Sequence, residues 1–352
     1  MLKQYISLIS PADEEAATEC RVRWDSLAKP LHSLGLLEDI ICKIAAVRGS
    51  ADVALKKRAV AVFCADNGVV ARGVSQSGPE VTATVAREMA AGRGNINALA
   101  RFARADVFPF DVGMAEDAPT VPAHKSAHGT ADFTVGPAMS REQAEDAVCF
   151  GIEVAERLKD RGYDVLIGGE MGIGNTTTST ALACVLLGCA PATLTGRGAG
   201  LSDAALIRKT RAIEQAIAVN APDPEDPLDL RASLGGFDIA AITGLFLGGA
   251  ACHVPVIVDG VIAAVAAVLA CRLAPACADF MLASHVSREP AHELLLDLIG
   301  LAPAIRGDMA LGEGSGGVML LPLLDAALAV YDQGSTFSSF GMEAYTPQEE
   351  PK

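Results

Sequence analysis

Residues 164–188 read DVLIGGEMGIGNTTTSTALACVLLG. A short apolar run leads into glycines and hydroxyl residues, and an apolar stretch of helical length follows. This order is typical of a buried strand that passes through a glycine-rich turn into a helix, where backbone N–H groups can bind an anion. The turn lacks the lysine of a nucleoside triphosphate loop. Two interpretations remain. The turn binds a single phosphate, or it is an ordinary strand-to-helix turn in which Thr176 or Thr177 caps the helix.

Apolar, β-branched runs of the same kind recur along the chain. Each ends in an acidic residue or a glycine and precedes a segment of helical character: residues 59–68, 105–114 and 254–263. Continuous apolar strands that alternate with helices indicate a parallel sheet buried on both faces. The predicted fold class is therefore α/β, with a mostly parallel sheet and helices on both faces.

Acidic residues stand at the carboxyl ends of these strands. Asp66, Asp111, Glu170 and Asp259 each lie at or just after a strand end. In a parallel α/β sheet the ligand binds beyond the carboxyl ends of the strands. We therefore expect these side chains to gather on one edge of the sheet, at the active site.

Both ends of the chain have a helical pattern in place of the strand–helix alternation of the middle. We expect a large α/β catalytic domain over residues 46–317. A small helical domain would then be built from both chain ends, residues 1–45 and 318–352.

Composition and charge narrow the class of protein and of partner. The 352 residues are 51% hydrophobic but only 5% aromatic, which favours a core of tightly packed aliphatic side chains. A formal net charge of -15 opposes binding to nucleic acid and to anionic membrane surfaces. The nine cysteines include no C-x-x-C pair, and the N-terminus lacks a signal-peptide pattern. We therefore expect reduced thiols in a cytoplasmic protein.

One uncharged stretch, Ile239–Val258, is long enough to span a bilayer. It contains the Gly248 and Gly249 pair, His253 and Pro255, which favour a helix, a turn and a buried strand over a membrane span. The histidines show no zinc-protease spacing. We expect no metal site and no cofactor.

Glu313 is the candidate for proton transfer. It stands between Gly312 and Gly314 in LGEGSGG, just ahead of an apolar helix. Glycines leave the carboxylate accessible to a planar substrate, while backbone and apolar groups restrict its water and raise its pKa toward that of a general base. The alternative is that Glu313 only precedes a helix that Ser315 caps.

Other polar segments offer weaker candidates. The loop with Ser75 and Ser77 follows the strand at residues 59–68 and suits a substrate-lining role, although turn formation also explains it. Lys209 follows a glycine-rich turn, and Ser284 and His285 lie in a predicted polar turn. These side chains either complete an anion site or are a solvated lysine and hydrogen-bonded turn residues.

Several blocks in order along the chain resemble one family. They are ADNGVVARGVSQSGPEVTA (65–83), GEMGIGNTT (169–177), GGFDIAAITGLFLGGA (235–250), VPVIVDG (254–260), SHVSREP (284–290) and LGEGSGG (311–317). The chain from about Val60 to Leu324 is similar to the nicotinate-nucleotide:5,6-dimethylbenzimidazole phosphoribosyltransferase family of cobalamin biosynthesis.

The resemblance implies a Rossmann-like large domain, a small helical domain and a homodimer. It implies transfer of phosphoribose from nicotinate mononucleotide to a lower-ligand base, which gives α-ribazole 5'-phosphate and nicotinate. Glu313 matches the family's catalytic base, and Lys209 falls where the family places a lysine near the phosphate. The implied substrate-binding residues are Ser77, Thr84, Glu170, Met171, Gly172, Gly174, Asn175, Thr176, Thr177, Lys209, Asp259, Ser284, Leu311 and Gly312.

The implied reaction requires few catalytic groups. The leaving pyridine departs readily because it was a cationic pyridinium, so only the incoming N–H requires a base. Two departures leave the accepted base open among benzimidazole, adenine and a phenolic compound: Asn67 replaces a family histidine, and Thr84 stands where some relatives have glutamine. A catalytically silent protein that binds a nucleotide or a lower-ligand base is the alternative function.

Overall fold

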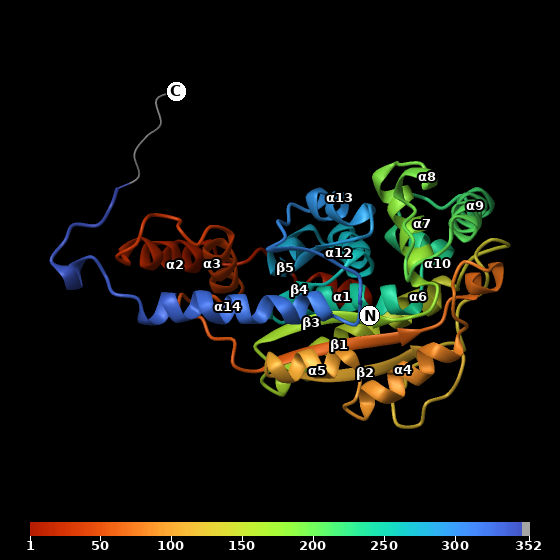
Figure 1. Ribbon diagram of the computed structural model, residues 1–352, viewed down its shortest axis with the longest axis horizontal. Helices are drawn as coiled ribbons and strands as arrows, with labels where there is room; N and C mark the ends of the chain where they lie inside the picture. The colour runs from red at the N-terminus through yellow and green to blue at the C-terminus, as the bar shows by residue number, and fades with distance from the viewer. Residues whose placement is uncertain (347–352) are drawn as a thin grey trace.

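The computed structural model describes residues 1–346. Its centre is a five-stranded parallel sheet in the order β2-β1-β3-β4-β5. The strands are β1 (Arg58–Ala65), β2 (Ala105–Gly113), β3 (Val165–Met171), β4 (Val256–Val258) and β5 (Met281–Ala283). Figure 1 shows helices on both faces of this sheet. The predicted α/β class and its parallel sheet are therefore confirmed.

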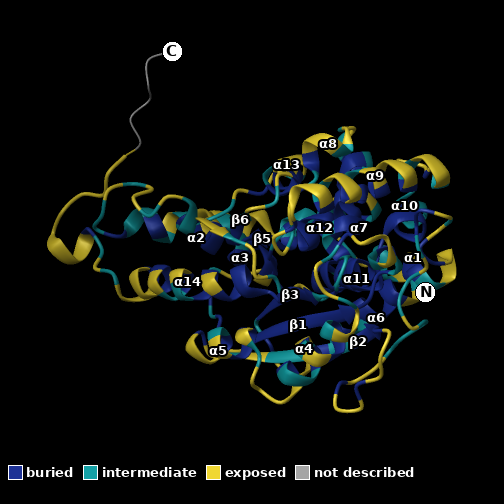
Figure 2. Cartoon of the chain, turned by 45° about the vertical axis from the view of Figure 1, so that its right-hand side comes forward, coloured by how far each residue is buried: buried dark blue, intermediate teal, exposed yellow. Residues whose placement is uncertain are grey.

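Alternate residues of β1 face two separate cores. Ala59, Ala61 and Phe63 belong to one core, with α6 (Arg141–Asp160), α7 (Asn175–Leu187), α11 (Phe237–Ala251) and α12 (Val261–Leu273). Val60 and Val62 belong to the other, with α4 (Glu80–Ala90), α5 (Asn95–Phe102) and α14 (Ser315–Gln333). The whole of β1 is buried (Figure 2). After Arg58, every position of β1 carries an apolar side chain, as burial on both faces requires.

The uncharged stretch Ile239–Val258 forms most of α11, a turn and β4, as predicted. Glycines allow α11 to lie directly on α6: a Cβ at Gly244 would stand 1.9 Å from the Val148 carbonyl oxygen. Every residue of α11 from Phe237 to Ala250 is buried. Burial in the protein core therefore explains the hydrophobicity of this stretch.

The two chain ends meet beside the sheet. Trp24 of α2 (Glu14–Ser26) packs against Tyr331 of α14, with ring centroids 4.9 Å apart, and α3 (Leu36–Arg48) also contacts α14. In contrast, α1 (Leu2–Ile6) packs on α11. The expected domain boundary at residue 318 falls in the first turn of α14, and residues 347–352 lie outside the described residues. The division into two domains stays a prediction.

Within residues 1–346, α14 is the one helix whose length and composition would allow it to cross a membrane. Of its most apolar window, 56% is buried, and it contacts α3, α5 and β3. These contacts explain its apolar character by packing.

Short elements complete the fold and were not all expected. The segment predicted as a polar turn after residue 283 instead forms β6 (His285–Ser287), which pairs in parallel with β7 (Ile305–Met309). Three-residue strands carry too little periodicity to be distinguished from a turn. The remaining elements are η1 (Gly68–Arg72), α8 (Pro191–Leu194), α9 (Asp203–Asn220), α10 (Pro227–Leu234), η2 (Pro275–Phe280), β6 (His285–Ser287), α13 (Ala291–Leu298), β7 (Ile305–Met309) and η3 (Ser338–Phe340).

Candidate active site

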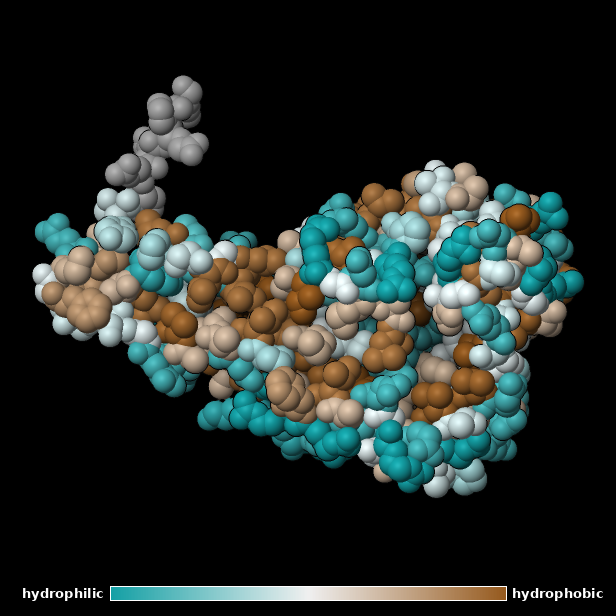
Figure 3. Space-filling model, in the orientation of Figure 1, coloured by the Kyte–Doolittle hydropathy of each residue, from teal (hydrophilic) through white to brown (hydrophobic). Residues whose placement is uncertain are grey.

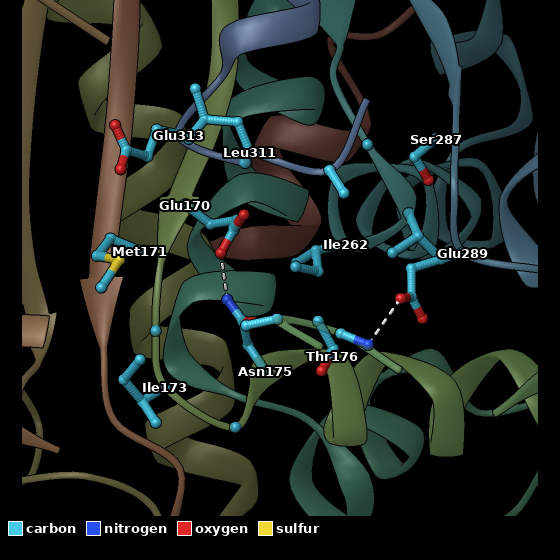
Figure 4. Close-up of a pocket in the computed structure, with 18 of the residues that line it drawn as sticks. Glu170, Met171, Ile173, Asn175, Thr176, Ile262, Ser287, Glu289, Leu311 and Glu313 are labelled. Carbon is cyan, nitrogen blue, oxygen red and sulfur yellow. Dashed lines mark hydrogen bonds between the residues drawn. The ribbon is translucent and has the colours of Figure 1, made fainter. Parts of the chain in front are cut away.

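A cavity of about 310 Å³ lies beyond the carboxyl ends of β3 and β4. Its walls come from segments far apart in the sequence: residues 74–76, 170–176, 197–201, 259–263, 285–289 and 310–313. Figure 4 shows Glu170, Asn175 and Thr176 on one side of this space and Glu289 and Ser287 on another. The position agrees with the general location of ligands in open parallel sheets.

Most of the predicted site residues line this cavity. They are Glu170, Met171, Gly172, Gly174, Asn175, Thr176, Asp259, Leu311, Gly312 and Glu313. The structure therefore brings the strand-end turn of β3 and the turn before α14 together, although more than 130 residues separate them in the chain. Their roles toward substrate stay predictions.

Five predicted binding residues lie outside the cavity lining: Ser77, Thr84, Thr177, Lys209 and Ser284. Ser77 is exposed, and the Thr84 hydroxyl donates to the Glu80 carbonyl on the outer face of α4. Thr177 is fully buried within α7. The Ser284 hydroxyl donates to the Val258 carbonyl at 2.7 Å. Thr84 therefore does not line this cavity, and its place near the base pocket stays a prediction.

Lys209 is fully buried, so the alternative of a solvated surface lysine is not found. Its Nζ donates to Thr176 Oγ1 at 3.0 Å and to the Gly196 carbonyl at 3.1 Å, and burial lowers its pKa. A Cβ at Gly198 would lie 3.7 Å from this Nζ. Lys209 thus lies behind the cavity wall and supports Thr176 from there.

Only two of the four strand-end acids reach the cavity, which corrects the expectation that all four gather at one site. Asp66 accepts hydrogen bonds from the Thr82 hydroxyl and the Ala115 N–H. Asp111 is paired with Lys125 at 2.7 Å. These two carboxylates hold loops in place, because their oxygens are already occupied by neighbouring donors.

The turn before α14 has an unusual backbone. Gly312, Glu313 and Gly314 have φ values of 78°, 63° and 85°, in the left-handed region that a non-glycine residue such as Glu313 seldom adopts. The Asp259 carboxylate accepts the N–H groups of Gly314, Gly316 and Gly317 at 2.6–3.2 Å. Asp259 therefore holds the start of α14 and compensates for the strain in the turn.

The Glu313 carboxylate faces the cavity from this turn. The residue is 7% exposed, and its Oε2 accepts the Ile96 N–H at 3.3 Å. Burial raises the pKa of Glu313, and the hydrogen bond from Ile96 lowers it to a smaller extent. Ser315 makes no capping hydrogen bond, so the capped-helix alternative is not found. The geometry suits acceptance of a proton from a bound molecule.

The turn before α7 places the N-terminus of that helix at the cavity. Its cap position is Gly174, with φ of 94°, and neither Thr176 nor Thr177 caps the helix with its side chain. A Cβ at Gly172 would lie 2.4 Å from the Ala65 carbonyl oxygen, so only glycine fits. The N–H groups of Asn175 and Thr177 donate to the Gly172 and Gly174 carbonyls, so the Thr176 N–H and Oγ1 are the groups of this helix start that suit an anion in the cavity.

The sequence reasoning missed the opposite wall. Glu289 Oε1 accepts the Gly198 N–H at 3.0 Å, and Arg197 pairs with Asp203. The glycine-rich turn and SHVSREP were both noted as motifs, but Arg197 and Glu289 carried no signal of their own. Among the described residues that line the cavity, Arg197 is the one basic side chain apart from the imidazole of His285.

Comparisons with known proteins agree with the family resemblance of the sequence blocks and extend over nearly the full chain. A family described as phosphoribosyltransferase matches residues 9–342. The nicotinate-nucleotide–dimethylbenzimidazole phosphoribosyltransferase of Ruminiclostridium cellulolyticum is 41% identical over 349 residues, which cover 99% of each chain. The protein of that name from Roseiflexus sp. is 44% identical and covers 97% of this chain and 98% of its own.

Solved structures agree with the sequence relatives. The crystal structure of CobT from Thermus thermophilus superposes with a TM-score of 0.87 at 39% identity and covers 94% of this chain and 99% of that one. The resemblance found in the sequence blocks is therefore confirmed. This chain belongs to the nicotinate-nucleotide–dimethylbenzimidazole phosphoribosyltransferase family.

Proposed function

We propose that this enzyme transfers phosphoribose from nicotinate mononucleotide to 5,6-dimethylbenzimidazole or a related lower-ligand base. The products are α-ribazole 5'-phosphate and nicotinate, which places the reaction in nucleotide-loop assembly of cobalamin. The names of the relatives support these substrates. The observation that carries the proposal is the buried Glu313 carboxylate at the edge of a cavity whose other side is the N-terminus of α7 with Thr176.

The two ends of the cavity suit the two substrates. The phosphate of the nucleotide would lie at the N-terminus of α7, near Thr176 and the Gly198 loop, with Lys209 supplying charge through Thr176. The planar base would lie against Met171 and Leu311, within reach of Glu313. This assignment keeps the anionic phosphate away from Glu313.

The chemistry follows from this arrangement. The bond between the ribose anomeric carbon and the pyridinium nitrogen breaks, and its electron pair neutralises that nitrogen. A ring nitrogen of the incoming base forms the new bond to the same carbon, and Glu313 accepts the N–H proton from the other ring nitrogen. Holding both substrates in one cavity supplies much of the remaining rate, because it replaces a bimolecular encounter.

The proposal extends to assembly and compartment. Apolar surface gathers along α14 (Figure 3), where Met319, Leu323 and Val330 are 38–40% exposed, and Phe102 of the adjacent α5 is 76% exposed. Such a patch supports a homodimer. Free cysteines, several of them buried, support a reducing, cytoplasmic setting. We retain the large domain of residues 46–317 and the small domain from both chain ends as part of this proposal.

The test is a direct assay. The purified protein is incubated with nicotinate mononucleotide and dimethylbenzimidazole, and the products are identified by mass. We expect free nicotinate and a phosphoribosylated base in equal amounts. Binding of both compounds without release of nicotinate would instead support the catalytically silent binding protein.

The accepted base requires a second assay. Dimethylbenzimidazole, benzimidazole, adenine and p-cresol are offered together, and the product masses give the order of preference. Asn67 donates from Nδ2 to the Ile173 carbonyl at 3.3 Å, behind the cavity. Because neither Asn67 nor Thr84 lines the cavity, we expect the preference for dimethylbenzimidazole to survive both departures from the family pattern.

A further inference from the structure

The Asn175 amide lies between two buried carboxyl groups. Its Nδ2 donates to Glu170 Oε2, as drawn in Figure 4, and also to Asp238 Oδ2 at 3.0 Å. Glu170 is 8% exposed and lines the cavity, whereas Asp238 is fully buried and does not. Asp238 is therefore linked to the cavity through one amide group.

The surroundings of this pair are acidic and contain no compensating cation. Within residues 1–346, no lysine or arginine forms an ion pair with Glu170 or Asp238. The titratable groups that face the pair from the neighbouring elements are Cys64 of β1, Asp66 after β1, Asp259 after β4 and Glu313 before α14. Two ionised carboxylates in such a place are strongly unfavourable, because neither their lost hydration nor their mutual repulsion is offset.

One proton on the pair removes most of that cost. Burial raises the pKa of Glu170, and the charge of Asp238 raises it further. Burial also raises the pKa of Asp238, to about 6. Both shifts have the same physical origin, because an ionised group here exchanges water for apolar walls and like charges.

Asn67 provides independent geometric support. Its Oδ1 is buried and accepts no hydrogen bond. A Cβ at Gly236 would lie 2.7 Å from this oxygen and 2.4 Å from Asp238 Oδ1, so the two acceptors border the same point. A proton on Asp238 would place a donor beside the acceptor that lacks one.

We propose that Asp238 is a positioning residue for Glu170: through the Asn175 amide it orients the Glu170 carboxyl toward the cavity, and the two carboxyl groups share one proton. The part that concerns substrate rests on the proposed function. The pair then presents a single negative charge beside the ribose carbon, which becomes positive as the pyridinium leaves. A second charge would be neutralised by proton uptake before substrate arrived.

Infrared spectroscopy of the resting protein tests the shared proton. The protonated-carboxyl band of Glu170 is identified by its loss in Glu170→Gln and is then followed against pH. In Asp238→Asn the like charge is removed, so we expect the midpoint of this band to fall by about one pH unit or more. In Asn175→Ala the donor that favours the ionised form is removed, so we expect the midpoint to rise.

Asp111→Asn is the matched control, because Asp111 is a buried acid at the same sheet edge that pairs with Lys125 and does not contact Asn175. Its midpoint should stay within a few tenths of a unit of the wild type. Equal midpoints in the wild type, Asp238→Asn and Asn175→Ala would overturn the proposal, whatever their melting temperatures. If Asp238→Asn does not fold, Asn175→Ala decides the matter alone.

The titration needs no substrate, so its outcome is separate from that of the transferase assay. An inactive wild-type protein with the expected midpoints would count against the proposed function and not against the shared proton. In an active enzyme we expect Asp238→Asn to lower kcat and to move the pH profile, with little change in KM for the base. A change in melting temperature alone would contradict a positioning role.

Discussion

The turns before α7 and α14 are built alike and used differently. Each leads into a helix through a left-handed glycine, Gly174 or Gly314, and neither helix has a side-chain cap of its own. The N–H groups at the start of α14 are filled by Asp259, whereas the start of α7 faces the cavity. The same local pattern thus yields a strained turn that carries Glu313 and is closed by a carboxylate, and a turn at the cavity that suits an anion. A residue more than 50 positions away makes the difference.

The largest effect should come from the side chain that the closed turn presents. Glu313→Gln keeps the size of the side chain and removes its ability to accept a proton. We expect kcat with dimethylbenzimidazole to fall about 100-fold to 10,000-fold. Circular dichroism should show an unchanged fold. A variant that keeps more than half of the wild-type rate would contradict the role of Glu313.

The closed turn should depend on Asp259 for stability. Asp259→Asn replaces one acceptor oxygen with a donor that faces the backbone N–H groups of α14. We expect the free energy of unfolding in urea to fall by about 2–3 kcal/mol. Asp52→Asn, at an exposed position, is the control and should change it by less than about 0.5 kcal/mol. Equal losses in the two variants would show that Asp259 does not hold the turn.

The pH dependence should report the environment of Glu313. The base acts in its ionised form, and burial raises the pKa of Glu313 above its usual value. Activity should therefore be full above that raised pKa and fall about tenfold per pH unit below it. The rate of nicotinate release between pH 4 and 8 measures this limb. A limb that lies at or below the ordinary glutamate pKa would contradict the burial argument.

The turn before α7 should give the smallest effect. Thr176→Val removes the hydroxyl that Lys209 contacts but keeps the shape of the side chain. We expect KM for nicotinate mononucleotide to rise about fivefold, with kcat and the free energy of unfolding nearly unchanged. Thr178→Val is the control, because Thr178 is buried and its hydroxyl donates within α7. A similar rise in both variants would place the phosphate elsewhere.

Sequence reasoning succeeded where a pattern is continuous. The strands β1 and β3 are buried on both faces, so their uninterrupted apolar runs indicated a parallel sheet. The short strand β6 was interpreted as part of a turn, and β5 and β7 were not predicted, because three to five residues carry little periodicity. The site was likewise predicted where the sequence pattern is clear. The turns at Gly172–Thr177 and Gly312–Gly314 were found because closely spaced glycines, which allow a close backbone approach, can be recognised in the sequence.

The remainder of the site depends on contacts between distant segments. Lys209 has a helical pattern like that of a surface lysine, and only the fold places the Gly196–Gly198 loop over it. Thr84 directly follows the buried Ala83, and its side chain is exposed on the outer face of α4. Glu289 and Arg197 were identified as lining residues only from the structure, in which their loops lie at the same cavity. Asp238 was part of a recognised block, yet its pairing with Asn175 is a tertiary feature.

The most direct test of the account compares two bases in one experiment. Wild-type enzyme and Glu313→Gln are each given nicotinate mononucleotide with dimethylbenzimidazole or with its N-methyl derivative, and nicotinate release is measured. The N-methyl base has no N–H proton to lose, so a proton acceptor cannot assist it. We predict a large ratio of wild-type to variant rate with the first base and a ratio near one with the second. The same large ratio with both bases would contradict proton acceptance by Glu313.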